Sequence, residues 1–172
     1  MIERPEAVTL EGKPMTVIGK ALQPGDAAPD FRVVAQDLSE KTLDDYTGKP
    51  LIISVVTSLD TGVCDLQTRR FDEEAARLAD KAAVLTISAD LPFAQKRWCS
   101  EAATDKVEVL SDHREMSFGD AWGTHVKELR VEQRAVFIVD AEGKIQYADY
   151  VPEISEHPNY QAALEAINKI VD

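Results

Sequence analysis

Two cysteines, Cys64 and Cys99, are the most nucleophilic side chains that the sequence offers. Cys64 follows the uncharged apolar run LIISVV (51–56) after a short loop and stands where a helical pattern begins. The thiolate is the reactive form of cysteine, and the free N–H groups and dipole at a helix N-terminus stabilise a negative charge. The position of Cys64 therefore suits a nucleophilic thiolate.

The charges next to Cys64 in the sequence oppose its ionisation, so a cation must come from elsewhere. Asp60 and Asp65 flank the cysteine, and like charges disfavour an anion. Arg134, which directly precedes the apolar segment AVFIVD, can reach it from another element. Thr61 suits the N-cap of the helix, and its hydroxyl could instead donate a hydrogen bond to the sulfur. On position alone, Cys64 as an inert buried side chain stays an open alternative, because unpaired cysteine is often fully buried.

The elements that must position these residues alternate between strand and helix. Short β-branched runs predict strands, and segments with apolar residues at helical spacing predict helices. The expected strands are 31–35, 51–56, 83–88 and 106–112, with hairpins over 8–18 and 135–150, and the expected helices are 62–81, 91–99, 114–123 and 159–171. This order predicts an α/β fold with a central mixed sheet flanked by helices and an N-terminal β-hairpin extension.

Composition excludes several classes of protein. The chain has 172 residues, 44% of them hydrophobic and 29% charged, which fits one domain over residues 1–172. The net charge of -12 argues against nucleic acid or an anionic membrane as a partner. Charged residues occupy the place of a signal peptide, and no segment is apolar enough to span a bilayer. We therefore expect a cytoplasmic protein, whose cysteines are inert, metal-binding or redox-active rather than permanently paired.

Three longer motifs resemble the thiol peroxidase branch of the peroxiredoxins, which are thioredoxin-fold enzymes that reduce hydroperoxides. They are SLDTGVCD around Cys64, SADLPFAQKRWC ending at Cys99, and LSDHREMSFGDAWG at 110–123. The segments RAVFIVD from Arg134 and APDF at 28–31 fit the same family. The resemblance runs from about Val8 to the C-terminus.

The resemblance implies a role for each of these residues. Cys64 would be the peroxidatic cysteine that becomes a sulfenic acid, and Cys99 the resolving cysteine that closes a disulfide within the same chain. Thr61 would orient the peroxide and bond the sulfur, and Arg134 would support the thiolate. The family uses thioredoxin as the reductant, commonly forms homodimers, and needs neither a metal nor another cofactor. No histidine has a metal-ligand spacing with either cysteine, which agrees with the expectation of no metal site.

The proposed cycle places a demand on the structure around the second cysteine. A sulfenic acid must be captured by a thiol before further peroxide oxidises it irreversibly. Cys99 is too distant in sequence for a CxxC pair and belongs to a different expected helix. Closing the disulfide therefore requires local unwinding, which predicts a mobile region around 92–104.

Two positions depart from the family pattern. Thr57 stands where the family has a proline that fixes the backbone and shields the sulfur, so we expect Thr57 to line the substrate pocket. The segment RVEQRAVF carries a polar lead-in to Arg134 where the family has an apolar one. The threonine at position 57 predicts an enzyme that is slower or more easily over-oxidised but not inactive; the change in the lead-in to Arg134 is the lesser departure. The alternative is a redox-sensing or partner-binding protein on the same fold; a general thiol–disulfide oxidoreductase is disfavoured because CxxC is absent.

Overall fold

The chain folds around two β-sheets, which a computed structural model describes for residues 1–171. The expected domain ends at Asp172, which lies outside the described residues. The strands are β1 (Glu3–Leu10), β2 (Lys13–Ile18), β3 (Arg32–Val34), β4 (Glu40–Thr42), β5 (Leu51–Val55), β6 (Ala83–Ser88), β7 (Glu108–Ser111), β8 (His125–Val126), β9 (Val131–Glu132), β10 (Ala135–Val139) and β11 (Ile145–Tyr150). The α-helices are α1 (Gly62–Leu78), α2 (Pro92–Ala102), α3 (Ser117–Trp122) and α4 (Tyr160–Val171), with 3-10 turns η1 (Leu43–Tyr46) and η2 (Ala79–Lys81).

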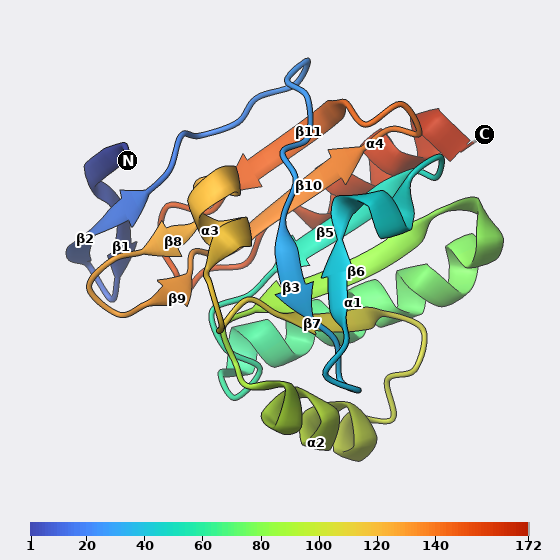
Figure 1. Cartoon of the computed structure of the whole chain (residues 1–172), viewed down its shortest axis with the longest axis horizontal. Coiled ribbons are helices and arrows are strands. Elements are labelled where there is room, and N and C mark those ends of the chain that lie inside the picture. The colour runs from blue at the N-terminus through green and yellow to red at the C-terminus, as the bar shows by residue number, and fades with distance from the viewer. Residues whose placement is uncertain (172) are drawn as a thin grey trace.

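The larger sheet has seven strands in the order β11-β10-β5-β6-β7-β3-β4. The three central strands β5, β6 and β7 are parallel, and β10 and β3 pair antiparallel with the outer two of them. Side chains alternate across β5: Ile52 packs against α1 and α4, and Ile53 packs with the aromatic residues of α3. The sheet therefore lies between α1 and α4 on one face and α3 on the other (Figure 1). The predicted mixed α/β sheet flanked by helices is confirmed.

The smaller sheet joins the N-terminal hairpin to a later part of the chain. Its order is β1-β2-β8-β9, and the hairpin turns at Glu11 and Gly12, which both have positive φ. Arg4 donates hydrogen bonds to the carbonyls of Gly19 and Gly123 and thereby holds the hairpin against the end of α3. The predicted hairpin is confirmed, but its extension by β8 and β9 was not predicted from the sequence.

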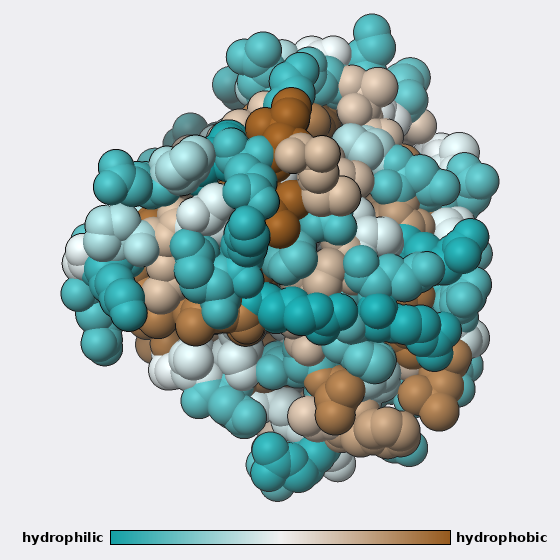
Figure 2. Space-filling model, turned by 60° about the vertical axis from the view of Figure 1, so that its left-hand side comes forward, coloured by the Kyte–Doolittle hydropathy of each residue, from teal (hydrophilic) through white to brown (hydrophobic). Residues whose placement is uncertain are grey.

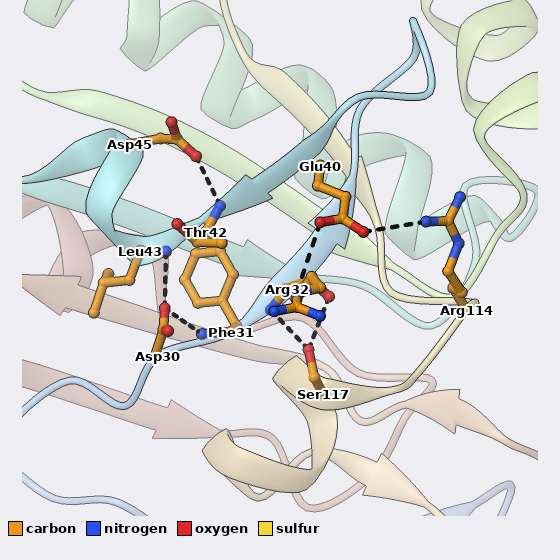
Figure 3. Close-up of polar contacts among 9 residues, drawn as sticks. All are labelled: Asp30, Phe31, Arg32, Glu40, Thr42, Leu43, Asp45, Arg114 and Ser117. Atoms are coloured by element: carbon orange, nitrogen blue, oxygen red, sulfur yellow. Dashed lines mark hydrogen bonds and ion pairs between the residues drawn. The ribbon is translucent and has the colours of Figure 1, made fainter.

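The short strand β4 forms the outer edge of the larger sheet and is covered by charged side chains. Figure 3 shows Glu40 between two guanidinium groups, at 3.8 Å from Arg32 and 3.5 Å from Arg114. Ser117 exchanges two hydrogen bonds with the backbone of Arg32, both at 2.8 Å, and so fastens the start of α3 to this edge. Charges on an edge strand discourage pairing with another chain.

The surface is mostly hydrophilic. In the view of Figure 2, polar side chains cover most of the face, and hydrophobic ones appear between them in small groups. Leu66, Leu91 and Phe93 are among the most exposed large apolar side chains. Across residues 1–171, none of the helices has both the length and the apolar character that crossing a bilayer requires.

Candidate active site

Cys64 lies in the first turn of α1, as predicted, directly beyond the carboxyl end of a central parallel strand. β5 ends at Val55, a loop follows, and α1 begins at Gly62 with Thr61 in the N-cap position. The end of a parallel strand and the start of the next helix form the edge where α/β sheets place their chemistry. Both cysteines are free thiols in this structure.

The side chain of Cys64 is fully buried. It belongs to an apolar cluster with Val56 and Leu59 from the preceding segment and Phe71 from the next turns of α1. Such walls exclude water, and electrostatic interactions are stronger where water is excluded. Whether the Cys64 thiol is inert or reactive therefore depends on which charged groups lie beside this cluster.

A buried guanidinium lies next to the first turns of α1. Arg134, which is only 1% exposed, donates from Nη1 to Oε1 of Gln67 at 2.9 Å. Its Nε and Nη2 both donate to the carbonyl of Ile154, at 3.0 and 2.7 Å. Gln67 follows Cys64 by three residues on the same helix, so the two side chains share one face of α1. The arginine thus reaches the cysteine-bearing face, as the sequence predicted.

The three hydrogen bonds of Arg134 all end on neutral oxygens. None of the ion pairs formed within residues 1–171 involves Arg134, so its charge is not neutralised there. Burying an unpaired charge is costly, and an anion nearby would recover that cost. A thiolate at Cys64 is such an anion.

Tyr160, at the start of α4, shows that these charges converge. Burial raises the pKa of Tyr160, while the positive charges of Arg134 and Arg70 lower it and a negative charge on Cys64 raises it. The guanidinium carbon of Arg70 lies 5.4 Å from the centre of the Tyr160 ring. Neither Tyr160 nor Gln67 was predicted from the sequence, although Gln67 carried a usable signal in its spacing from Cys64. Arg70 is near Cys64 in the sequence but was expected to lie a turn or more away along the helix.

The two threonines of the loop bond to the backbone. The hydroxyl of Thr61 donates to the carbonyl of Ser58 at 3.0 Å, so it neither caps the helix nor donates to the sulfur in this structure. Its exposed position leaves the oxygen free to accept a bond. The hydroxyl of Thr57 donates to the carbonyl of Glu132 at 2.8 Å. The two departures from the family pattern, at 57 and in the lead-in to Arg134, are therefore in direct contact.

Cys99 lies in α2, where its half-buried side chain packs against the apolar cluster that also contains Cys64. Its sulfur accepts a hydrogen bond from Nε2 of Gln36 at 3.3 Å and borders a cavity of about 550 Å³ beside Thr104. Burial raises the pKa of the Cys99 thiol, and hydrogen bonds from Thr104 and Gln36 oppose that rise. The neighbouring Trp98 makes the contact with α1, through a 2.9 Å hydrogen bond to Asp65. The two thiols are unpaired in this structure, and the mobility expected for residues 92–104 stays a prediction.

Two buried carboxyl groups, Glu132 and Asp112, lie close together near this site. Glu132 and Asp112 form a side-chain hydrogen bond, and burial raises the pKa of both. Asp112 accepts backbone N–H groups of Phe118 and Gly119, which favour its ionised form. Burial and the neighbouring Asp112 carboxylate raise the pKa of Glu132 well above its usual range, so beside an ionised Asp112 the proton belongs to Glu132.

We expect Glu132→Gln to stabilise the protein at alkaline pH. A group with a raised folded-state pKa contributes stability that is present below its unfolded pKa, about 4.3 for Glu, and lost as pH rises through the folded value. Glutamine keeps a donor for Asp112 at every pH, so its contribution to the free energy of unfolding does not fall as the pH rises. The free energy of unfolding should therefore match wild type near pH 4 and exceed it by about 1–3 kcal/mol near pH 9. Urea unfolding across this range measures it, and parallel curves for the two proteins would contradict a proton on Glu132.

Among the described residues, no group of three or more His, Cys, Asp or Glu side chains is arranged to hold a metal ion. The candidate site therefore consists of the two cysteine thiols, the Arg134 guanidinium and the threonine hydroxyls.

Comparison with known proteins agrees with this geometry. The family model described as Redoxin matches residues 23–164. The thiol peroxidase of Bacillus subtilis (strain 168) is 56% identical over 164 residues, which are 95% of this chain and 98% of that protein. The thiol peroxidase of Halalkalibacterium halodurans is 54% identical over 160 residues, 93% of this chain and 96% of the other.

Solved structures give the same picture. A peroxiredoxin-like protein from Aquifex aeolicus has a TM-score of 0.89 at 38% identity, covering 96% of this chain and 98% of its own. A thiol peroxidase from Chromobacterium violaceum has a TM-score of 0.84 at 19% identity, covering 94% and 95%, and supports the fold alone. The thioredoxin-like fold that the sequence predicted is confirmed.

Proposed function

Because the chain belongs to the thiol peroxidase group of the Redoxin family and is a peroxiredoxin-type enzyme, we propose that it reduces hydrogen peroxide and organic hydroperoxides through a sulfenic acid on Cys64. Cys99 resolves this acid as an intramolecular disulfide, and thioredoxin reduces the disulfide. Each subunit of an expected homodimer carries a complete set of these residues, and the reducing cytoplasm supplies the reductant.

The chemistry balances at each step. The Cys64 thiolate attacks one peroxide oxygen, an S–O bond forms as the O–O bond breaks, and the alkoxide or hydroxide leaves and takes a proton. The Cys99 thiolate then attacks the sulfenic sulfur, forming the S–S bond and releasing hydroxide, which is protonated to water. The dithiol of thioredoxin exchanges with this disulfide and returns both thiols.

One observation carries the proposal: the unneutralised Arg134 guanidinium buried beside the face of α1 that bears Cys64. If Cys64 were an inert core residue, a buried unpaired cation beside it would have no function. If Cys64 is the nucleophile, the cation stabilises its thiolate and the negative charge that develops on the leaving oxygen. Thr61, in the N-cap position of the helix, contacts the peroxide in this proposal through its exposed hydroxyl oxygen.

The alternative is a redox sensor in which Thr57 has lowered turnover. The structure weakens the basis for this, because the Thr57 hydroxyl is bonded to the Glu132 carbonyl and does not add a free polar group to the pocket. We therefore expect turnover in a coupled assay with thioredoxin, thioredoxin reductase and NADPH. A protein that is oxidised once but never turns over would favour the sensor.

We expect Thr57→Pro to speed the first step. Proline restores a rigid apolar wall at the cost of one hydrogen bond, and the net gain in second-order rate constant should be at most on the order of tenfold, which corresponds to about 1.4 kcal/mol. Stopped-flow oxidation by hydrogen peroxide measures it. Thr57→Val, which also loses the hydroxyl but leaves the backbone free, is the matched control. Equal rates for all three proteins would show that this position hardly affects catalysis.

A further inference from the structure

Asp90 lies between the two cysteine-bearing segments and bonds to both. It belongs to the loop that joins β6 to α2, and α2 carries Cys99. Its carboxylate accepts a hydrogen bond from the Ser58 hydroxyl at 2.8 Å and one from the Leu59 backbone N–H at 2.9 Å. Ser58 and Leu59 belong to the loop that leads from β5 to Cys64.

The same carboxylate is fixed to the end of its own strand. Ser88, the last residue of β6, donates from its hydroxyl to Oδ2 of Asp90 at 2.7 Å. The hydroxyl of Ser111, the last residue of β7, donates to the backbone carbonyl of Asp90 at 2.5 Å. Asp90 is thus held by the ends of two central strands while it holds the loop before Cys64.

Two other contacts join α2 to the Cys64 segment farther along. Arg97 of α2 lies 3.6 Å from Asp60, with both side chains largely exposed, and Trp98 bonds to Asp65 of α1. Exposed ion pairs contribute little, whereas hydrogen bonds to a carboxylate are among the strong ones. The exposed Arg97 pair therefore contributes little, and the Trp98 bond joins α2 to α1 itself. The Asp90 contacts are the bonds to a carboxylate that join the loop before Cys64 to the start of α2.

From these contacts, and on the basis of the function proposed above, we propose that Asp90 is a positioning residue with opposite effects on the two halves of the cycle. It holds the loop of Ser58 and Leu59 in the conformation in which Cys64 and Thr61 meet the peroxide. The same bonds oppose the local unwinding that brings Cys99 to the sulfenic acid. Asp90 thereby lengthens the time during which a second peroxide can oxidise Cys64 to the sulfinic acid.

The test compares Asp90→Ala with wild type for two quantities. The first is the second-order rate of Cys64 oxidation by hydrogen peroxide in stopped flow. The second is the fraction of sulfinic acid formed per turnover, read by intact mass with the thioredoxin system running. We expect the oxidation rate to fall by about ten- to a hundredfold and the sulfinic fraction to fall as well.

Variants keep the test informative if Asp90→Ala folds poorly. Asp90→Asn can still accept from the Leu59 N–H and donate to the Ser58 hydroxyl oxygen, so it should lie near wild type. Ser58→Ala removes one of the two loop bonds and should shift both quantities in the same direction by a smaller amount. Asp140→Ala is the matched control: its carboxylate accepts bonds from Glu142, Lys144 and Gln146 in the turn between β10 and β11. That turn lies at the end of the sheet opposite to the Cys64 loop. We therefore expect the oxidation rate and the sulfinic fraction of Asp140→Ala to equal those of wild type.

Two outcomes contradict the proposal. One is oxidation of Asp90→Ala at the wild-type rate. The other is slower oxidation with a sulfinic fraction that is unchanged or raised, as general damage to the site would produce. Wild-type protein that fails to react with peroxide in the same experiment contradicts the proposed peroxidase function instead, so the two failures are distinguishable.

Discussion

Cys64→Ser is expected to lower peroxide consumption at least about a thousandfold in the thioredoxin-coupled assay, because the hydroxyl of serine is a far weaker nucleophile than a thiolate. Serine is close to cysteine in size, so the buried cluster around it is preserved. Cys99→Ser is expected to differ in kind. It should keep the wild-type rate for the first oxidation and then stop, holding one added oxygen on Cys64.

Intact mass after one equivalent of hydroperoxide separates the two roles. Wild type should lose two hydrogens within one chain, Cys99→Ser should gain one oxygen, and Cys64→Ser should stay unchanged. Circular dichroism of each variant checks that the fold is retained. Sustained turnover by Cys99→Ser would contradict its resolving role, and oxidation of Cys64→Ser at the wild-type rate would contradict the assignment of the nucleophile.

The central part of the fold could be predicted because its signals are local. β5 and β6 are uncharged β-branched runs, Pro92 marks the first turn of α2, and Gly123 ends α3 in the left-handed conformation. β4, β8 and β9 are only two or three residues long, too short to show a period. Their pairing is decided by distant partners, such as Val17 with Val126, which no local pattern reveals.

The residues of the site likewise divide into those that could be predicted from the sequence and those that could not. Cys64, Thr61 and Arg134 stand in motifs whose residues are close in sequence, so their types and spacing point to the chemistry. Asp90 stands inside the motif SADLPFAQKRWC and Tyr160 stands outside the motifs, but both make contacts with segments far away along the chain, which the local sequence does not reveal. The bond between Thr57 and Glu132 shows the limit most clearly, because two departures that look independent in the sequence meet in the fold.

Arg134→Met is the second change with a large expected effect, because it removes charge and hydrogen bonds together. Oε1 of Gln67 and the carbonyl of Ile154 lose buried donors, which should lower the free energy of unfolding by about 2–4 kcal/mol. Loss of the guanidinium beside Cys64 should slow its oxidation by about a hundred- to a thousandfold. Urea unfolding and stopped-flow oxidation measure the two losses separately.

Two further variants decide whether the rate loss of Arg134→Met comes from the missing charge or from a loosened structure. Arg134→Lys keeps the charge, but one ammonium cannot replace the fork that bonds both Ile154 and Gln67. It should therefore be destabilised much as the methionine variant is and yet oxidise faster. Gln67→Leu removes one of the three hydrogen bonds of Arg134, together with the bonds that Gln67 donates to Ser54 and Val55, and leaves the guanidinium in place. The free energy of unfolding should therefore fall clearly, whereas the rate should fall only a few-fold. If the rates of all three variants simply follow their stabilities, Arg134 supports the fold and the thiolate at Cys64 needs another source of positive charge. If the lysine variant is faster than its stability predicts, the buried cation acts on the reaction itself.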